Sequence, residues 1–338
     1  MTQKNNNNII SQKELPEDKK MDLNLRPKTL QDFIGQEKLK ANLKIFIQAA
    51  KQRQQPLEHA LFHGNHGLGK TTLSYIIAHE MDTEIQVTSG PALEKVGDLA
   101  AILTSLKDGS ILFIDEIHRL NRSIEEVLYP AMEEYALDLI VGQGPSAKIL
   151  RLDLPQFTLI GATTRPSLIS PPLRDRFGAV YQLNFYQTSE IKEIVLRSAD
   201  ILKIKIEEKA AQEVAQCSRF TPRVANRLLK RVRDFAQVHD HEKINQKIAQ
   251  QALEMLEIDH LGLNYTDRRI LSCLIEKFSG GPVGIKTLAV ATGEDLNTIE
   301  EIYEPYLIQS GFLDRTLRGR IATPLAYKHL GYKRGFPF

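Results

Sequence analysis

The chain has 338 residues and a formal net charge of +2, with 42% hydrophobic and 25% charged residues. This composition is typical of a globular protein with two or three domains, and it excludes a disordered or polycationic chain. Two widely separated cysteines, Cys217 and Cys273, argue against a zinc module or a disulfide framework. No stretch has the length and apolarity of a membrane span, and residues 1–20 lack the apolar core of a signal peptide. We therefore expect a protein of the reducing cytoplasm that does not contact the membrane.

The first half of the chain predicts a sheet covered by helices. Residues 1–20 are expected to form a polar tail. An amphipathic helix follows, and its apolar residues are Leu39, Leu43, Ile45, Phe46 and Ile47. From residue 61 to residue 186, apolar strands alternate with helical patterns, which is typical of a mostly parallel α/β sheet. The expected strands cover residues 60–63, 84–88, 110–114, 157–162 and 179–183.

One segment departs from this alternation. Residues 137–141 and 148–152 alternate between apolar and polar side chains around the turn sequence Gly142-Gln143-Gly144-Pro145. This pattern predicts a β-hairpin that stands off the α/β domain. Ile140 and Ile149 occupy apolar positions of the hairpin, and an exposed apolar patch marks a candidate surface for a partner protein.

The second half of the chain is mostly helical. The first expected helices cover residues 188–202, 207–217, 222–238 and 245–257 and form a small helical domain. Further helices are expected at 265–278, 285–292 and 295–308, followed by short strands around 316–319. Three helices and a β-ribbon are typical of a winged helix-turn-helix domain. We expect a polar tail at 1–20 and domains at 21–186, 187–258 and 259–338.

Phosphate binding is predicted by a segment with the P-loop spacing G-x-x-x-x-G-K-[ST], placed between an apolar strand and a helical pattern. Gly64, Gly67 and Gly69 would let the backbone turn its N–H groups toward phosphate oxygens. Lys70 would reach the β- and γ-phosphates of ATP, and the Thr71 hydroxyl would ligate Mg²⁺. A chance glycine turn is the alternative, and the flanking strand and helix favour nucleotide binding.

Two further strand ends carry candidate catalytic groups. Asp115 and Glu116 follow an apolar strand, which is a Walker B pattern. Asp115 would hold Mg²⁺, directly or through water, and Glu116 would polarise the attacking water as a general base. Thr163 and Thr164 end another apolar strand, and strand tips face the ligand in a doubly wound sheet. Thr164, or else Thr163, would hold the water or the γ-phosphate, unless the pair caps the strand.

Arginines near the predicted nucleotide site are candidates for contacts with phosphate. Arg174 and Arg176 lie just beyond the sheet, and a positive side chain there would stabilise the charge that develops during phosphoryl transfer. An ion pair with Asp175 at the surface is the alternative. Arg223 lies in the first turn of a helix that carries Arg223, Arg227 and Arg231 on one face, and it is expected to face the nucleotide. A basic helix face of this kind is more often exposed to solvent.

A second group of arginines lies in the last domain. Arg315, Arg318 and Arg320 surround a turn that contains Gly319, and Asp314 is the one acidic residue beside them. A basic wing of this kind suits the phosphate backbone of DNA, although a solvated turn would have the same composition.

Together these motifs resemble those of AAA+ ATPases, and most closely those of the RuvB family. The matching segments are Gly67–Thr72, Phe113–Leu120, Glu125–Glu133, Gly161–Arg165, Leu173–Gly178, Pro305–Gln309 and Gly311–Leu313. The resemblance covers about residues 21–330, and the hairpin and the winged domain fall in the order of the family. One departure is Asn65-His66, where the family usually has two prolines; this leaves the loop less stiff.

The resemblance implies an ATP-driven motor that uses Mg²⁺ and moves double-stranded DNA through a homohexameric ring. Its activity would be Holliday junction branch migration in recombination and repair. RuvA would bring the ring to the junction, the hairpin at 137–152 would dock RuvA, and the RuvC resolvase would act with them. Arg315 and Arg320 match DNA-contacting positions of the family.

The resemblance also implies roles at the ATP site. Thr164 matches sensor 1, Arg176 matches the arginine finger that acts on a neighbouring subunit, and Arg223 matches sensor 2. Further residues that match the nucleotide site are Leu25, Arg26, Thr72, Glu133, Glu134, Tyr135 and Tyr186.

Two other functions share parts of this pattern. A clamp-loader-like ATPase would also have a P-loop and an arginine finger, but it would more often carry a zinc module and a helical collar. A transcription factor regulated by ATP would use the winged helix to read a base sequence. Preference for a four-way junction over any promoter sequence would distinguish the motor from the transcription factor.

Overall fold

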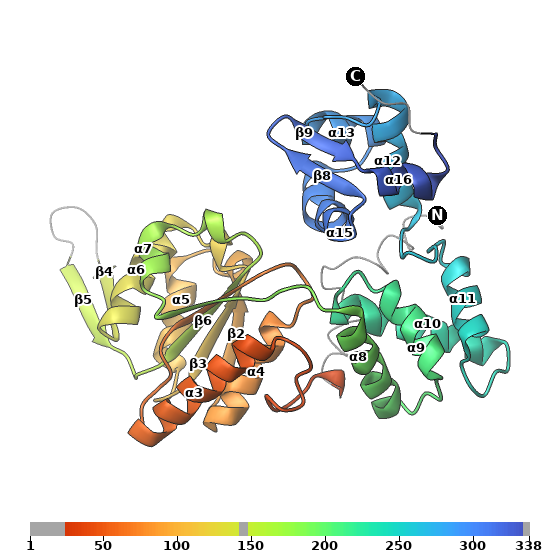
Figure 1. The fold of residues 1–338 in the computed structure, drawn as a ribbon. Coiled ribbons are helices and arrows are strands. Elements are labelled where there is room, and N and C mark those ends of the chain that lie inside the picture. The colour runs from red at the N-terminus through yellow and green to blue at the C-terminus, as the bar shows by residue number, and fades with distance from the viewer. Residues whose placement is uncertain (1–23, 142–147, 334–338) are drawn as a thin grey trace. The chain divides into compact units, whose positions relative to one another are not determined.

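The structure is a computed structural model that describes residues 24–141 and 148–333 (Figure 1). It contains two compact units, Arg26–Asn184 and a second unit that runs from Phe185 onward and includes Leu25. The predicted tail at 1–20 and the turn Gly142–Pro145 lie outside the described residues, as do the side chains of residues 139–149. Within the described part of the chain, no helix is both long and apolar enough to cross a membrane.

A five-stranded parallel sheet forms the centre of the first unit. Its strands are β1 (Ala60–His63), β2 (Ile85–Ser89), β3 (Ile111–Asp115), β6 (Thr158–Thr163) and β7 (Ala179–Gln182). Their order is β2-β3-β6-β1-β7, and every neighbouring pair is parallel. The parallel sheet predicted from the alternating pattern is thereby confirmed. Because β3, β6 and β1 are neighbours, the polar residues that follow these strands are brought to one edge of the sheet.

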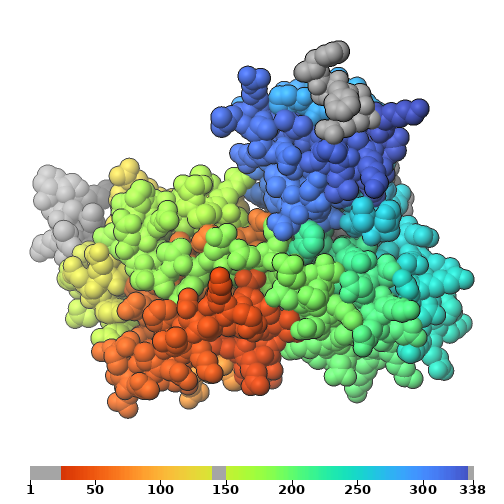
Figure 2. Space-filling model, in the orientation of Figure 1, coloured from red at the N-terminus to blue at the C-terminus, as the bar shows by residue number. Residues whose placement is uncertain are grey.

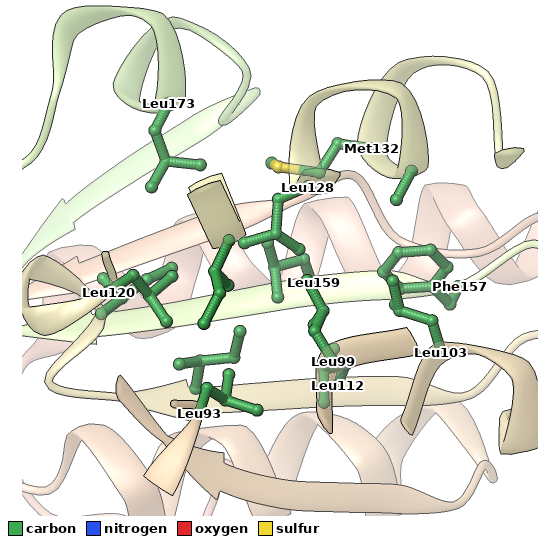
Figure 3. Close-up of a cluster of buried hydrophobic side chains, with 14 of the residues drawn as sticks. Leu93, Leu99, Leu103, Leu112, Leu120, Leu128, Met132, Phe157, Leu159 and Leu173 are labelled. Atoms are coloured by element: carbon green, nitrogen blue, oxygen red, sulfur yellow. The ribbon is translucent and has the colours of Figure 1, made fainter. Parts of the chain in front are cut away.

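Helices cover both faces of this sheet (Figure 1). They are α3 (Glu37–Arg53), α4 (Lys70–Met81), α5 (Val96–Ser105), α6 (Arg122–Glu133) and the short α7 (Pro171–Asp175). Helix α4 packs on β2, β3 and β6, and α3 packs on α4. A cluster of buried leucines joins α5 and α6 to the sheet, and it includes Leu99 and Leu103 of α5 and Leu112 and Leu159 of the strands (Figure 3). This apolar packing fixes the strand tips that carry the candidate site.

Helix α3 buries a narrower face than the sequence pattern indicated. Leu39, Leu43 and Ile47 are buried as expected, but Ile45 is 63% exposed and Phe46 is 47% exposed. At 100° per residue, position 45 turns away from the face shared by residues 39, 43 and 47, whereas position 46 lies at the edge of that face, about 20° from position 39. Figure 2 shows helix α3, in orange-red, at the surface of the first unit.

The predicted hairpin is present and stands off the sheet (Figure 1). Strands β4 (Ala136–Val141) and β5 (Lys148–Asp153) pair antiparallel, with the backbones of Ile140 and Ile149 directly opposite each other. Leu150 on β5 is 47% exposed. The hairpin therefore presents at least one apolar side chain to solvent, which suits a surface for a partner.

The second unit begins with a helical bundle and continues into a winged-helix fold. The bundle consists of α8 (Thr188–Ile201), α9 (Glu208–Gln216), α10 (Pro222–Val238) and α11 (Gln246–Met255). The winged part contains α12 (Tyr265–Phe278), α13 (Ile285–Thr292), the antiparallel strands β8 (Leu313–Thr316) and β9 (Gly319–Ala322), and α16 (Pro324–Leu330). Helix α16 has no counterpart among the predicted elements.

The helix expected at 295–308 is divided in the structure. It consists of α14 (Leu296–Thr298), a π-helical segment over Ile299–Tyr303 (η5), and α15 (Glu304–Gln309). Pro305 explains the division, because its ring clashes with the carbonyl four residues earlier and it has no N–H group to donate. The π-helical turn, closed by the N–H of Glu304 on the carbonyl of Ile299, accommodates the proline without ending the helix.

A buried ion pair links the bundle to the winged part. Arg219 lies between α9 and α10, Asp267 lies on α12, and both side chains are 0% exposed. The guanidinium donates to the Asp267 carboxylate and lies over the rings of Tyr303 and Tyr306, with Cζ–centroid distances of 5.5 and 4.6 Å. Burial raises the pKa of Asp267, and Arg219 together with the N–H of Asn264 acts in the opposite direction. The charged form of the Asp267 carboxylate is thus stabilised by Arg219.

Removing this arginine should destabilise the second unit strongly. We expect Arg219→Met to lower the free energy of unfolding by about 3–5 kcal/mol, because it leaves a buried carboxylate without its charge partner. Chemical denaturation followed by circular dichroism measures this loss. The matched control is Arg122→Met, which breaks an exposed pair with Glu126 and should change stability little. Equal effects of the two substitutions would contradict the argument.

Candidate nucleotide-binding site

The P-loop joins the end of β1 to the start of α4. Gly64, Gly67 and Gly69 have φ angles of 142°, 77° and 103°, in the region that favours glycine. A side chain at Gly64 would also place its Cβ 2.5 Å from the carbonyl oxygen of Leu183. The three glycines are therefore required by the backbone path, as the sequence motif predicted.

The P-loop lysine is held inside its own loop. Lys70 is 7% exposed, and its Nζ donates to the carbonyl oxygens of Gly64 and Asn65 at 2.7 and 2.8 Å. Thr71 follows in the first turn of α4, where unsatisfied N–H groups and the helix dipole favour an anion. Burial lowers the pKa of His63 at the end of β1, and the charges of Arg174 and Lys70 lower it further. The end of β1 thus lies in a positive environment that suits phosphate.

The Walker B carboxylates lie at the end of β3. Glu116 has φ and ψ of 49° and 44°, a left-handed conformation that few residues other than glycine adopt. Its N–H donates to the Asp115 Oδ1 at 2.9 Å, which satisfies one oxygen of that carboxylate. Unusual backbone angles of this kind cluster at active sites, where the surrounding structure maintains them.

Side chains of Thr164, His118 and His66 approach the Glu116 carboxylate. The Thr164 hydroxyl lies 3.5 Å from Oε2, and the Nδ1 of His118 lies 3.4 Å from the same oxygen. The Nδ1 of His66, from the P-loop, lies 3.7 Å from Oε1. Thr163 is buried instead, with its hydroxyl 2.8 Å from the Nδ1 of His118. Of the two threonines, the structure therefore brings Thr164 to the carboxylate.

Gly90, which follows β2 and lies against the backbone of Glu116, was not predicted from the sequence. Gly90 begins a short 3-10 turn after β2, and a Cβ at this position would lie 2.5 Å from the carbonyl oxygen of Glu116. The sequence feature that could have indicated this contact is a glycine directly after β2, the strand that pairs with β3. His66 and His118 were likewise given no role, because their approach to Glu116 depends on the fold.

Arg176 lies at the end of α7 and contacts α6. Its guanidinium donates to the carbonyl of Pro172 at 2.7 Å, pairs with Glu133 at 3.2 Å and lies 4.3 Å from the centroid of the Tyr129 ring. Arg176 and Glu133 thus form one cluster. Their side chains are 21% and 53% exposed, so the cluster is accessible from solvent.

The other residues of the 133–135 segment point elsewhere. Glu134 pairs with Arg151 on β5, and the Tyr135 ring packs against His59 and Phe157 with centroid distances of 6.4 and 5.9 Å. Tyr135 therefore contributes to the apolar packing under the hairpin, which the sequence did not indicate.

The remaining candidates for the nucleotide site occur in both units. In the first, the Arg26 guanidinium lies 4.4 Å from the centroid of Tyr75 on α4. In the second, the carbonyl of Leu25 accepts from Arg197, the buried Tyr186 donates its N–H to the carbonyl of Phe220, and Arg223 is in the first turn of α10. Thr72 is half-buried on α4.

The wing does not present its arginines equally. Arg315 and Arg320 face each other across β8 and β9. Arg320 is buried and donates to both oxygens of Glu304, whereas Arg315 is 59% exposed and lies 3.5 Å from the same carboxylate. Arg318, in the turn between the strands, is exposed. The buried Glu304 carboxylate requires a charge partner, and this pairing makes Arg320 less accessible than Arg315; DNA contact by these arginines stays a prediction.

A P-loop on a five-stranded parallel sheet, a helical bundle and a winged helix together define an AAA+ ATPase with a nucleic-acid-binding fold at its C-terminal end. Three family models match in the same order. They are the Holliday junction DNA helicase RuvB P-loop domain at residues 25–183, the RuvB AAA lid domain at 186–259 and the RuvB C-terminal winged helix domain at 260–331.

Solved structures of RuvB from Thermotoga maritima are similar to the chain throughout. The structure described as the Holliday junction branch migration motor is 51% identical, with a TM-score of 0.84, and the match covers 92% of this chain and 99% of that one. An alanine-to-serine mutant of the same protein has a TM-score of 0.85 at 51% identity, covering 91% and 99%. The chain belongs to the RuvB family, whose members are ATP-driven helicases of Holliday junctions. Neither the clamp-loader nor the transcription-factor alternative is favoured.

Crowding at Gly90 should disturb the ATPase more than the fold. We expect Gly90→Ala to lower ATP turnover by about 10- to 100-fold, because its Cβ would displace the backbone that carries Glu116. Steady-state ATPase assays measure the effect. Gly97→Ala on α5 is the matched control, since its Cβ would meet no atom within 4 Å and alanine favours a helix. Normal turnover in Gly90→Ala would contradict this role.

Proposed function

We propose that the chain hydrolyses ATP with Lys70, Thr71, Asp115, Glu116 and Thr164 and uses this reaction to drive branch migration on double-stranded DNA. The observation that carries the assignment is the position of the Glu116 carboxylate, next to Thr164 and beside the P-loop histidine. A general base has to lie within reach of the water that attacks the γ-phosphate. The strand order supports this role for Glu116, because β3 and β6 are neighbours and β1, which leads into the P-loop, follows next in the sheet.

Nucleotide binding would exchange the partners of Lys70. The carbonyls of Gly64 and Asn65 hold the ammonium inside the loop, and phosphate oxygens of ATP would replace them. A charged hydrogen bond to phosphate is stronger than one to a neutral carbonyl, so the exchange favours the bound state. Gly67, Gly69 and the first turn of α4, which contains Thr72, would supply the N–H groups that surround the phosphates.

The residues at the strand tip suit Mg²⁺. The Thr71 hydroxyl and the Asp115 carboxylate are hard oxygen ligands, and this ion typically takes one or two such groups together with phosphates and water. Because the Glu116 N–H satisfies Oδ1 of Asp115, the other oxygen is available for a ligand role. Bound Mg²⁺ would neutralise charge on the β- and γ-phosphates. Glu116 would accept the proton of the attacking water, and Thr164 would orient that water.

The Arg176–Glu133 cluster would act on the ATP of a neighbouring subunit in a homohexameric ring. An arginine supplied in trans stabilises the charge that develops on the phosphoryl group. Its charge partner Glu133 is an exposed carboxylate, and such pairs contribute little. Release toward a phosphate would also exchange the hydrogen bond to the Pro172 carbonyl and the contact with the Tyr129 ring. Glu134 and Tyr135 remain predictions for the nucleotide site that rest on the family resemblance. The same holds for Leu25, Arg26, Tyr186 and the sensor-2 residue Arg223.

Partner assignments also rest on the resemblance. The projecting hairpin, with Ile140 and Ile149 on paired backbone positions, would dock RuvA, and RuvC would act on the same junction. A motor that processes chromosomal junctions would work in the cytoplasm. We place the domain boundaries at 21–186, 187–258 and 259–338.

Separate losses of binding and chemistry would test the ATPase assignment. Glu116→Gln should lower turnover by about 10²–10⁴-fold and leave nucleotide affinity near the wild-type value, because it removes a base and not a phosphate contact. Lys70→Ala should lose both. ATPase assays and titration with a fluorescent nucleotide measure the two properties. If Glu116→Gln hydrolysed ATP at the normal rate, the base would have to be another residue.

The wing should hold DNA without reading its sequence. We assign phosphate contacts to Arg315 and Arg318, whose side chains are exposed, and keep Arg320 as a weaker candidate because Glu304 engages it. Contacts to phosphate position a protein on DNA and carry no direct sequence information.

A salt titration tests the contact of Arg315. Arg315→Ala should weaken binding equally for two unrelated duplexes and lower the slope of log affinity against log salt by about 0.9. The matched control is Arg315→Lys, which retains the charge and should retain the slope. Loss of affinity for one duplex and not the other would show that the wing reads bases. Arg320→Ala is unsuitable for this test, since it would remove the closer of the two arginines beside the buried Glu304 and leave the 3.5 Å contact with Arg315.

A further inference from the structure

The Glu116 carboxylate has one imidazole beside each of its oxygens. His118 approaches Oε2 at 3.4 Å, and His66 approaches Oε1 at 3.7 Å. The two histidines come from different motifs, since His118 follows β3 and His66 belongs to the P-loop. The side chains of His66 and Glu116 are 18% and 22% exposed, so this contact is largely shielded from solvent. The loop that surrounds the phosphates thus reaches the carboxylate directly.

The two histidines are anchored differently. The Nδ1 of His118 also lies 2.8 Å from the buried hydroxyl of Thr163, which fixes its ring to β6. His66 lies on the P-loop, between Asn65, whose carbonyl holds Lys70, and Gly67, whose φ is 77°. A change in the loop that releases Lys70 toward phosphate therefore involves the carbonyl of Asn65, the residue directly before His66. The contact of His118 with Glu116 therefore depends on the position of the sheet, and the contact of His66 with Glu116 depends on the position of the P-loop.

We propose that His66 is a positioning residue that orients the Glu116 carboxylate from the P-loop side. A glutamate side chain has several rotatable bonds, and ordering it costs rotamer entropy. Contacts on both oxygens restrict the carboxylate to one orientation before the substrate arrives. Because a misplacement of about 1 Å can cost about 100-fold in rate, such restriction affects turnover without affecting ATP binding.

The proposal rests on Glu116 being the general base, and its test separates the two claims. His66→Leu keeps a side chain of similar size but removes the ring nitrogen, and it should lower kcat about tenfold while KM for ATP stays within about twofold. His66→Asn places an amide nitrogen near the position of Nδ1 and should restore most of kcat. The control is His79→Leu, the same change on an exposed histidine near the far end of α4, which should leave kcat unchanged.

A double-mutant cycle identifies the residue through which His66 acts. In the Glu116→Gln background, His66→Leu should change the residual single-turnover rate less than about twofold, because the carboxylate that it orients is absent. An equal loss of rate in both backgrounds would overturn the proposal, as would a wild-type kcat in His66→Leu or a failure of His66→Asn to recover activity. A larger effect on KM than on kcat would assign His66 to phosphate binding instead. Normal turnover in Glu116→Gln would refute the base assignment itself.

Discussion

Parallel pairing of β3 with β6 and of β6 with β1 is the constraint on which the ATPase site depends. Each strand ends in a different functional group, namely the Walker B acids, the Thr163-Thr164 pair and the P-loop. Parallel strands place all their carboxyl ends at one edge of the sheet, so this pairing alone brings together residues that are distant in sequence. The pairing is in turn maintained by apolar packing of α4 against the strands on one side and by the leucine cluster of α5 and α6 (Figure 3).

Local spacing explains why much of this arrangement could be predicted from the sequence. The P-loop, the Walker B acids and the hairpin are each defined by residues close together along the chain, and the structure contains each at its expected place. Patterns that require a fixed geometry over many residues were less reliable. Ile45 and Phe46 were counted among the apolar residues of an amphipathic helix, but both are exposed on α3. The helix predicted at 295–308 is divided, because a π-helical segment over Ile299–Tyr303 accommodates Pro305.

Side-chain partners were the part that the sequence could not provide. Arg320 was expected at the DNA surface, but it pairs with Glu304, a residue of another element. Arg219 and Asp267 form a fully buried pair, although neither attracted attention in the sequence. A buried charge needs a partner, but the sequence does not say which arginine will supply it. In this chain, burial separates Arg219 and Arg320, which pair with buried carboxylates, from Arg315 and Arg318, which are exposed to solvent.

The P-loop has two connections to the rest of the catalytic site, and they differ in kind. One is covalent, since the loop joins β1 to α4, and it fixes where phosphate binds. The other is the approach of His66 to Glu116, which depends on how the loop is folded at a given moment. Because Lys70 is held by loop carbonyls here, its move toward phosphate would release the carbonyls of Gly64 and Asn65, and Asn65 is the residue before His66. Because His66 already lies beside Glu116 before phosphate binds, a base oriented from this loop would meet the substrate in one orientation, which favours turnover.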